Sequence, residues 1–311
     1  MRTSRFAAAV VLLGLGQVGL AWHGRGHDKA TRVAVSALPK EMPAFFAAGA
    51  DSIAHCSQDP DLFRKPLVAG QVHATERAEH YCDLERLGRK KLPDHRYDLL
   101  MWCGENKVQP SAVGFVPYAV TEWTQRLSVA FAEHRAWPDN EHIRQKALVY
   151  AGLLAHYAQD LCQPLHTTVH YDGRTKADGS SPRSGIHLKT DALLEKVPAK
   201  AKVAVAAKSV QPFAELFPAV VAELSASHAL VDKVYELKKL LPAGAEPIKA
   251  GGPVAAFTAE RLKAAALFTA RLYLTAWRDS AKVKIPAWHR RQPRGGRAQA
   301  RPAGGPASSA K

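Results

Sequence analysis

The segment HYAQDLCQPLH carries three residues that can do chemistry: His156, Asp160 and His166. Residues four apart lie on one face of a helix, so His156 and Asp160 are expected side by side. Pro164 disfavours helical geometry just before it, which places His166 on the following loop near the same helix end. Such residues can bind a metal ion, cap and pack an ordinary helix, or act as an acid-base pair. The segment alone does not choose among these roles.

A second pair with the same spacing occurs in GIHLKTDALLE, where His187 and Asp191 lie four residues apart. Alone, this pair is most simply interpreted as a solvated helix face. A glycine-containing loop with His166 and His170 joins the two pairs. Two matched pairs beside further histidines are harder to attribute to chance, so the combination favours a metal site.

Two upstream segments add residues of the same kinds. RAEHYCDLERL holds His80, Tyr81 and Asp83, and CSQDPDLFRK holds Asp59 and Asp61. In isolation, His80 is a core histidine that donates to a carbonyl group, and Asp-Pro-Asp is an ordinary turn. These residues become informative only beside the histidine and aspartate pairs.

The first 21 residues have the features of a secretory signal peptide. Arg2 and Arg5 precede an apolar run from Phe6 to Leu20, and Gly19-Leu20-Ala21 is a small-x-small cleavage site. A membrane anchor needs about 20 apolar residues, more than this run contains. We predict a secreted or periplasmic protein that is cleaved after Ala21 and has no stable membrane anchor.

Cleavage after Ala21 makes Trp22 the first residue of the mature chain, within WHGRGHDKA. A free α-amino group and the carbonyl oxygen of the same residue can chelate a cation in a five-membered ring. His27 adds an imidazole, and Gly24 and Gly26 let the segment fold back on a metal. The alternative is a frayed terminus with one exposed histidine.

Together these segments contain more candidate ligands than one tetrahedral ion can use, and imidazole and carboxylate groups suit zinc. Three zinc ions would use them fully. The predicted metal-binding residues are Trp22, His27, Asp61, His80, His156, Asp160, His166, His187 and Asp191.

In combination, these motifs resemble those of the secreted zinc-dependent phosphodiesterases. That family includes the fungal single-strand-specific nucleases of the S-one and P-one type and bacterial phospholipase C. The W-x-x-x-G-H start, the H-x-x-x-D-x-x-x-x-x-H centre and the later H-x-x-x-D follow the order of the family. The resemblance covers most of the mature chain, is carried by residues 22–191, and implies an all-α protein with three zinc ions.

The resemblance also implies how the ligands are shared among the ions. One ion takes Asp61, His80, His156 and Asp160; its neighbour takes the Trp22 amine and carbonyl, His27 and the shared Asp160; the third takes His166, His187 and Asp191. A bridging role for Asp160 explains its position one helical turn from His156.

The segment DPDLFR leaves two candidates for the early aspartate of the family. The resemblance favours Asp61, which has Arg64 shortly after it, over Asp59. Paired metal ions lower the pKa of a bridging water and so provide hydroxide at neutral pH. We expect this water to attack phosphorus in line, with Asp61 orienting it and the ions stabilising the developing charge.

The substrate is less clear than the reaction. Tyr81 and Asp83 match positions near a base-binding pocket of the nuclease branch, where an aromatic face stacks on a base and a carboxylate accepts from an amino group. Packing and structural hydrogen bonding are an equal alternative for both. The last motif ends in Asp191, whereas the phospholipase branch more often ends in Glu. We therefore predict an endonuclease acting on single-stranded DNA or RNA, with 3'-nucleotidase activity as a further expectation, and phospholipase C as the alternative.

Two other classes of function are less consistent with these residues. His27-Asp28 is also the dipeptide of HD-domain phosphohydrolases, but that assignment leaves Trp22 and the later H-x-x-x-D unused. A non-enzymatic secreted helical protein that binds polyanions would require the whole ligand set to be coincidental.

Charge and cysteine content add weaker expectations. The net charge is +15, but the tail 289–311 contributes six positive charges and the signal peptide two, so the mature body is only moderately basic. That balance supports a phosphate-bearing substrate and favours nucleic acid only weakly. The Pro/Gly/Arg/Ala-rich tail is predicted to be disordered. Export would allow two disulfides, in any of three pairings, among Cys56, Cys82, Cys103 and Cys162.

Helical periodicity dominates wherever a pattern is clear, and alternating strands are not evident. We predict a single all-α domain over residues 22–288, monomeric, with long helices around a trinuclear zinc cleft. The expected helices are 27–38, 117–134, 141–163, 187–197, 212–240 and 253–279, and the expected irregular stretches are 51–79, 103–116 and 167–186.

Overall fold

The computed structural model describes residues 24–66, 70–88, 90–198 and 203–290. Within these residues the regular elements are α-helices and short 3-10 helices, without a strand, so the fold is all-α as predicted. The predicted signal peptide, Trp22 and most of the basic tail lie outside the described residues. No helix in the described part is long and apolar enough to cross a membrane.

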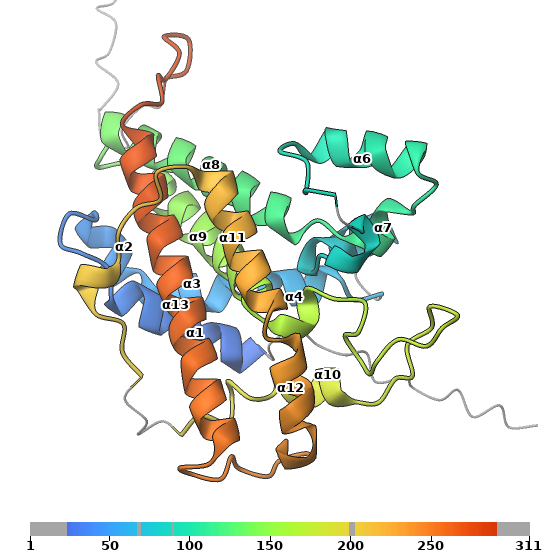
Figure 1. The fold of residues 1–311 in the computed structure, drawn as a ribbon. Coiled ribbons are helices and arrows are strands. Elements are labelled where there is room, and N and C mark those ends of the chain that lie inside the picture. Colours follow the sequence, from blue (N-terminus) through green and yellow to red (C-terminus); the bar gives the residue numbers. More distant parts are fainter. Residues whose placement is uncertain (1–23, 67–69, 89, 199–202, 291–311) are drawn as a thin grey trace, which may run out of the picture.

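Four long helices form the body of the protein (Figure 1): α1 (Gly24–Ser36), α8 (Val116–Ala136), α9 (Glu141–Leu161) and α13 (Pro253–Ser280). Helix α9 contacts each of the other three, and α13 also packs on α1 and α8. Helix α9 is therefore well placed to anchor a site, because it is held from several sides.

The remaining elements surround this body, and one of them, α11, is as long as α1, at 13 residues. The α-helices are α2 (Ala44–Ala48), α3 (Ala50–Cys56), α4 (Asp59–Phe63), α5 (Gly70–Glu76), α6 (Arg96–Glu105), α7 (Pro110–Val113), α10 (Ile186–Asp191), α11 (Leu216–His228) and α12 (Val231–Leu237). The 3-10 helices are η1 (Arg77–His80), η2 (Leu84–Leu87), η3 (Pro164–His166), η4 (Ala207–Ser209) and η5 (Lys238–Leu240).

Both ends of α9 follow from local sequence. The Asn140 side chain accepts hydrogen bonds from the backbone N–H groups of His142 and Ile143, which caps the start of the helix. The helix ends at Leu161, shortly before Pro164, and the chain turns into η3 with His166 as its last residue. The predicted turn of His166 past the proline is confirmed.

The long predicted helices match α1, α8, α9 and α13. The prediction of one helix over 212–240 was wrong, because the chain forms α11 and α12 with a break between them. Val220 and Leu224 of α11 pack in one hydrophobic cluster, whereas Val231 and Val234 of α12 pack in another. A single straight helix would not pack against both clusters. The periodicity of apolar residues does not show which cluster each half of the segment packs against.

The predicted helix over 187–197 was too long, because α10 ends at Asp191 and turns follow. The stretch 51–79 was wrongly expected to be irregular: it forms α3, α4, α5 and part of η1. Ile53 and Ala54 are fully buried there, and α3 packs on α9. Tertiary contacts therefore stabilise helices that are too short to show a helical pattern in the sequence. The stretch 103–116 includes the end of α6 and all of α7, whereas the 167–186 loop is irregular as predicted.

Two hydrophobic clusters make up the core. The larger includes Ala155 and Ala158 of α9, and the smaller includes Ala30, Leu165 and Ile186. Each of these residues lies within four positions of a predicted metal ligand. The candidate ligands therefore lie next to residues of both apolar clusters, at the boundary between them.

The prediction of two disulfides was wrong, since all four cysteines are free thiols. Cys162 Sγ lies 3.6 Å from Glu223 Oε1, and Cys56 packs against Gly152 of α9. A sequence shows that thiols are available but not whether the fold brings any two together.

Candidate metal centre

Six elements bring the predicted ligands together. Helix α9 contributes two of them, and α1, α4, η1, η3 and α10 supply the others. Eight of the nine predicted ligands are in the described residues, and all eight belong to groups able to hold a metal ion. They are His27, Asp61, His80, His156, Asp160, His166, His187 and Asp191.

Asp160 is the centre of this arrangement and is fully buried. Its Oδ2 atom lies 2.8 Å from His80 Nδ1 and 3.2 Å from His156 Nε2. Its Oδ1 atom lies 3.5 Å from His27 Nε2 and 3.6 Å from His166 Nδ1. One carboxylate thus faces four imidazoles, which is the position a bridging ligand requires.

The potential ligand atoms form three groups, two of which share His156. His80, His156 and Asp160 form one; His27, Asp61 and His156 form the second; His166, His187 and Asp191 form the third. The third group contains the same residues as the third ion of the resemblance. Asp61, which the resemblance joins to His80, is grouped here with His27.

Three imidazoles are oriented by hydrogen bonds at the nitrogen that points outward. His27 Nδ1 contacts Gln159 Oε1, His156 Nδ1 contacts the Ser57 carbonyl, and His166 Nδ1 contacts the His80 carbonyl, each at 2.8 Å. An acceptor at Nδ1 fixes the tautomer that leaves Nε2 free to bind a metal.

Unpaired polar atoms gather at the same place. Of ten buried side-chain nitrogen or oxygen atoms without a hydrogen-bond partner in the described residues, six belong to predicted ligands. They are His27 Nε2, His80 Nε2, Asp160 Oδ1, His166 Nε2, His187 Nδ1 and Asp191 Oδ2. Because an unpaired buried polar atom is costly, this concentration fits residues arranged to hold metal ions.

The protonation states of His27, His166 and Asp160 suit metal binding. Burial, followed by the nearby His156, lowers the pKa of His27 to about 3, and burial lowers the pKa of His166. Burial opposes ionisation of Asp160, but His156 and His166 outweigh it and hold the pKa of that carboxyl well below its usual range. Neutral imidazoles and an ionised carboxylate are the forms that coordinate a cation.

Arg64 is a member of the site that the ligand motifs do not include. Its side chain is 11% exposed, and its Nε donates a 2.7 Å hydrogen bond to Asp61 Oδ1. Its Nη2 also lies 2.7 Å from Asp61 Oδ1 but is not aligned for a hydrogen bond. The guanidinium charge also interacts electrostatically with His80 and His187, so it acts on more than one ligand group. Burial and Arg64 oppose protonation of these two imidazoles, but Asp160 and Glu76 at His80, and Asp191 at His187, outweigh them and raise both pKa values. Its sequence signal is its position one turn after Asp61.

Gln159 and Gln163 were also missed. Gln159 Nε2 donates to Thr31 Oγ1 while its oxygen contacts His27, and Gln163 Nε2 donates to Asp191 Oδ1 at 2.6 Å. Both amides are fully buried. In the sequence, these two residues lie four positions apart and next to the ligands of α9, and this spacing could have indicated that they support the site.

The structure gives different positions to the residues whose roles the sequence left open. Asp61 is 7% exposed and belongs to a ligand group, whereas Asp59 belongs to none. The Tyr81 hydroxyl donates to the Ser111 carbonyl, and its ring packs on Gly114, where a Cβ would lie 2.6 Å from the ring. Asp83 is buried, and burial, followed by Glu85, raises its pKa to about 7.

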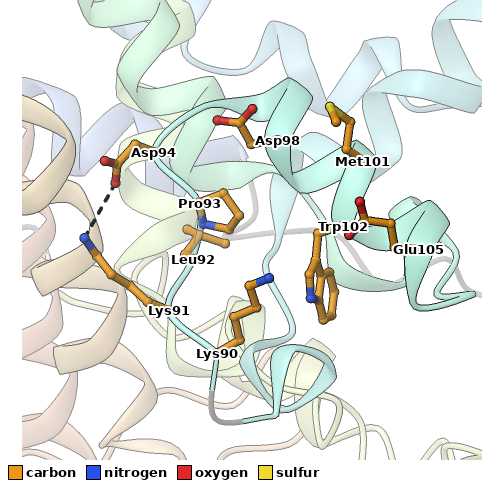
Figure 2. Close-up of a pocket in the computed structure, with 9 residues that line it drawn as sticks. All are labelled: Lys90, Lys91, Leu92, Pro93, Asp94, Asp98, Met101, Trp102 and Glu105. Carbon is orange, nitrogen blue, oxygen red and sulfur yellow. Dashed lines mark ion pairs between the residues drawn. The ribbon is translucent and has the colours of Figure 1, made fainter.

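A separate groove lies along α6 (Figure 2). Its walls carry Lys91 and Asp94, which form a 3.7 Å ion pair, and its lining also includes Met101 and Trp102. None of the lining residues is a predicted metal ligand. The groove is therefore distinct from the candidate metal centre.

No protein-family model and no curated protein matches the sequence. Among solved structures, the alpha toxin of Clostridium absonum aligns at 12% identity with a TM-score of 0.45, over 85% of this chain and 64% of the toxin. The alpha-toxin of Clostridium perfringens from the avian strain SWCP aligns at 11% identity with a TM-score of 0.41, over 86% of this chain and 65% of the toxin. The chain thus spans less than two thirds of the length of either toxin.

Proposed function

We propose that the protein is a zinc-dependent phosphodiester hydrolase. The observation that carries this proposal is the set of five imidazoles and three carboxylates around Asp160, all of them buried except the half-buried His187; within each group the ligand atoms lie within 4.8 Å of one another. Histidine and aspartate without thiolate suit zinc ions that retain open coordination positions for chemistry. When bound, zinc supplies an activated water and a Lewis acid at neutral pH.

The side chains of the site have complementary roles in this reaction. Asp61 lies among His27 and His156, close enough to orient an attacking water and accept a hydrogen bond from it. Arg64 places a nearly buried positive charge beside Asp61, where it binds a nonbridging phosphoryl oxygen and stabilises charge that develops there. The two clusters of the core hold these groups in place before the substrate arrives.

We propose a phospholipid ahead of single-stranded nucleic acid as the substrate. Exposed apolar side chains flank the metal centre: Leu62 follows Asp61 and is 57% exposed, and Tyr171 is 40% exposed with its ring edge-on to His187. An apolar rim suits a substrate with acyl chains. Tyr81, which the nuclease hypothesis uses for base stacking, is held by packing and by its own hydrogen bond.

Single-stranded nucleic acid remains the second candidate. Asp83 supports it, because this buried carboxylate interacts electrostatically with His187 and is able to accept from a base amino group. The two toxin structures give the nuclease hypothesis no support.

A side-by-side assay tests both substrates. Purified protein is given phosphatidylcholine vesicles, single-stranded DNA and single-stranded RNA, each with and without a chelator. We expect chelator-sensitive release of the phosphorylated head group from the lipid. Hydrolysis of nucleic acid alone would reverse the order of the candidates, and chelator-insensitive hydrolysis would contradict the metal-based proposal.

We further propose that the protein is exported as a monomer and cleaved after Ala21. The new Trp22 amine and carbonyl would then join His27 at the second ligand group. One extra residue before Trp22 is expected to impair zinc binding there, whereas an extra residue at the C-terminus is not. Equal zinc binding by both extended proteins would remove Trp22 from the ligand set.

A further inference from the structure

His80 differs from the other ligands in the partner of its outward nitrogen. Its Nδ1 lies 2.8 Å from Asp160 Oδ2 and 3.0 Å from His156 Nε2, so this nitrogen faces the ligand group. Its Nε2 is buried and lies 3.5 Å from Glu76 Oε1, without an aligned hydrogen bond to it in this structure. A neutral imidazole that binds an ion through Nδ1 carries its proton on Nε2, and Glu76 is the acceptor within reach.

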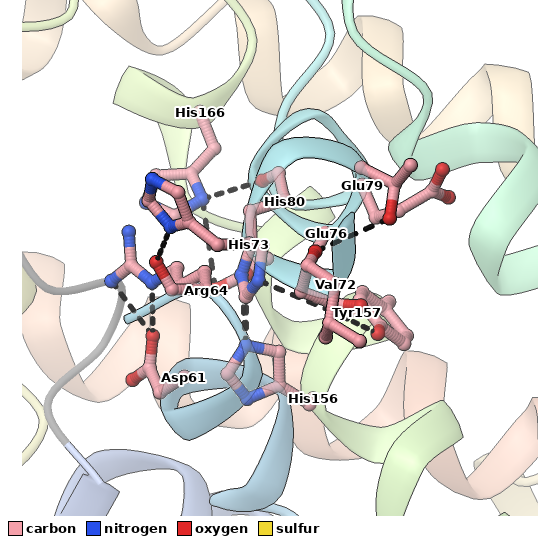
Figure 3. A network of polar contacts seen from close by, with 12 residues as sticks. Asp61, Arg64, Val72, His73, Glu76, Glu79, His80, His156, Tyr157 and His166 are labelled. Atoms are coloured by element: carbon pink, nitrogen blue, oxygen red, sulfur yellow. Dashed lines mark hydrogen bonds and ion pairs between the residues drawn. The ribbon is translucent and has the colours of Figure 1, made fainter. Parts of the chain in front are cut away.

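Glu76 is itself held in place by Tyr157 (Figure 3). The Tyr157 hydroxyl donates a short hydrogen bond to Glu76 Oε1. The Tyr157 ring also meets His80 and His156 edge-on, with centroids 5.7 and 5.5 Å away. Tyr157 therefore contacts the imidazoles of His80 and His156 and also the carboxylate of Glu76, which lies beside His80.

The other outward contacts described for the imidazoles are neutral. His27 contacts an amide oxygen, and His156 and His166 contact backbone carbonyls. A carboxylate behind a histidine fixes its ring orientation and raises its basicity as a ligand. Among these four imidazoles, His80 is thus the one whose metal affinity depends on a second charged side chain.

We infer that Glu76 and Tyr157 are positioning residues for His80: Glu76 accepts the Nε2 proton, and Tyr157 fixes Glu76, so that Nδ1 is presented to an ion shared with His156 and Asp160. This inference rests on the metal part of the proposed function. It makes the ion at His80 selectively sensitive to changes at Glu76.

Zinc competition titrations of the full chain with a chromophoric chelator test the inference, using the metal affinity as the readout. For Glu76→Ala we expect one bound ion to weaken by about 10- to 100-fold while the affinities of the others stay unchanged. Glu76→Gln keeps a neutral acceptor and should weaken that ion less. Tyr157→Phe, which removes only a hydroxyl, should act in the same direction.

A double variant tests whether Tyr157 acts on His80 through Glu76, which we call a relay, or whether Tyr157 and Glu76 act on His80 independently. If Tyr157 acts through Glu76, Glu76→Ala combined with Tyr157→Phe should bind zinc as Glu76→Ala alone does. Additive losses would overturn the relay. Glu105→Gln on α6 and Tyr150→Phe on α9 are matched controls away from the site, and both should bind zinc as the original protein does.

The outcomes distinguish this inference from the proposed function. Absence of zinc binding by the original protein would contradict the metal centre itself. Normal zinc binding by the original protein together with unchanged affinities in Glu76→Ala and Tyr157→Phe would overturn only the inference. Equal weakening of all ions with lower thermal stability of the metal-free variants would also overturn it, since that pattern marks a general structural role.

Discussion

The close contact between α3 and α9 provides a quantitative test of the structure. Gly152 lies in the middle of α9 and faces α3. A Cβ at Gly152 would lie 2.4 Å from the Cβ of Cys56 and 2.8 Å from the carbonyl oxygen of Ile53. Because a packed interior has no room for this approach, the substitution Gly152→Ala must push α3 away from α9.

The expected loss can be worked out from two opposing terms. Overpacking of a core contact costs about 1 to 3 kcal/mol, and replacing a helical glycine by alanine returns about 0.5 to 1 kcal/mol. We therefore expect Gly152→Ala to lower the free energy of unfolding by up to about 2.5 kcal/mol. Zinc affinity should fall as well, because Ser57 directly follows α3 and its carbonyl orients His156.

Urea unfolding of the metal-free protein and a zinc titration measure the two effects. Gly104→Ala on α6 is a matched control, since nothing lies within 4 Å of a Cβ added at Gly104. That variant should be at least as stable as the original protein and bind zinc equally well. If Gly152→Ala behaved like Gly104→Ala in both assays, the tight packing of α3 on α9 would be refuted.

Three further predictions concern the site. Asp160→Asn removes the charge that faces four imidazoles, so zinc retained after gel filtration should fall, and an unchanged metal content would contradict its central role. Arg64→Met should leave zinc content unchanged but lower kcat/KM by roughly 10- to 100-fold, the value of a charge-assisted hydrogen bond to the phosphoryl group; an unaltered kcat/KM would remove Arg64 from the mechanism. Burial raises the pKa of Asp83 from 3.8 to about 7, so folding disfavours its ionised form, and this penalty grows between pH 4 and 7 and then levels off. In metal-free protein, the stability of Asp83→Asn relative to the original should rise over that range, and a pH-independent difference would show that the carboxyl is not buried.

Much of the fold was accessible from local patterns. The long helices α1, α8, α9 and α13 each bury a continuous apolar face. Such a face requires apolar residues three and four positions apart, and this spacing can be recognised in the sequence. The short helices α3 and α4 were not predicted, because a five- or seven-residue helix is stabilised by packing on α9 more than by its own composition. The same limit concealed the break between α11 and α12.

The candidate ligands could be selected from sequence because His156 and Asp160, like His187 and Asp191, repeat a spacing that one helix face imposes. Among the supporting residues, Glu76 precedes His80 by the same four residues, so its place beside His80 is local. Tyr157 is remote in the chain, and only the packing of η1 on α9 brings it to Glu76 and His80.

The sequence by itself therefore determined the helical class, the residue types available for zinc, and their local pairing, because each depends on neighbours within one or two turns. Tertiary structure decided the grouping of the ligands around Asp160, the choice of Asp61 over Asp59 as a group member, and the free state of the cysteines. Those outcomes depend on distances between segments that are remote in sequence. Such distances are set by the packing of the two apolar clusters, at whose boundary the candidate centre lies.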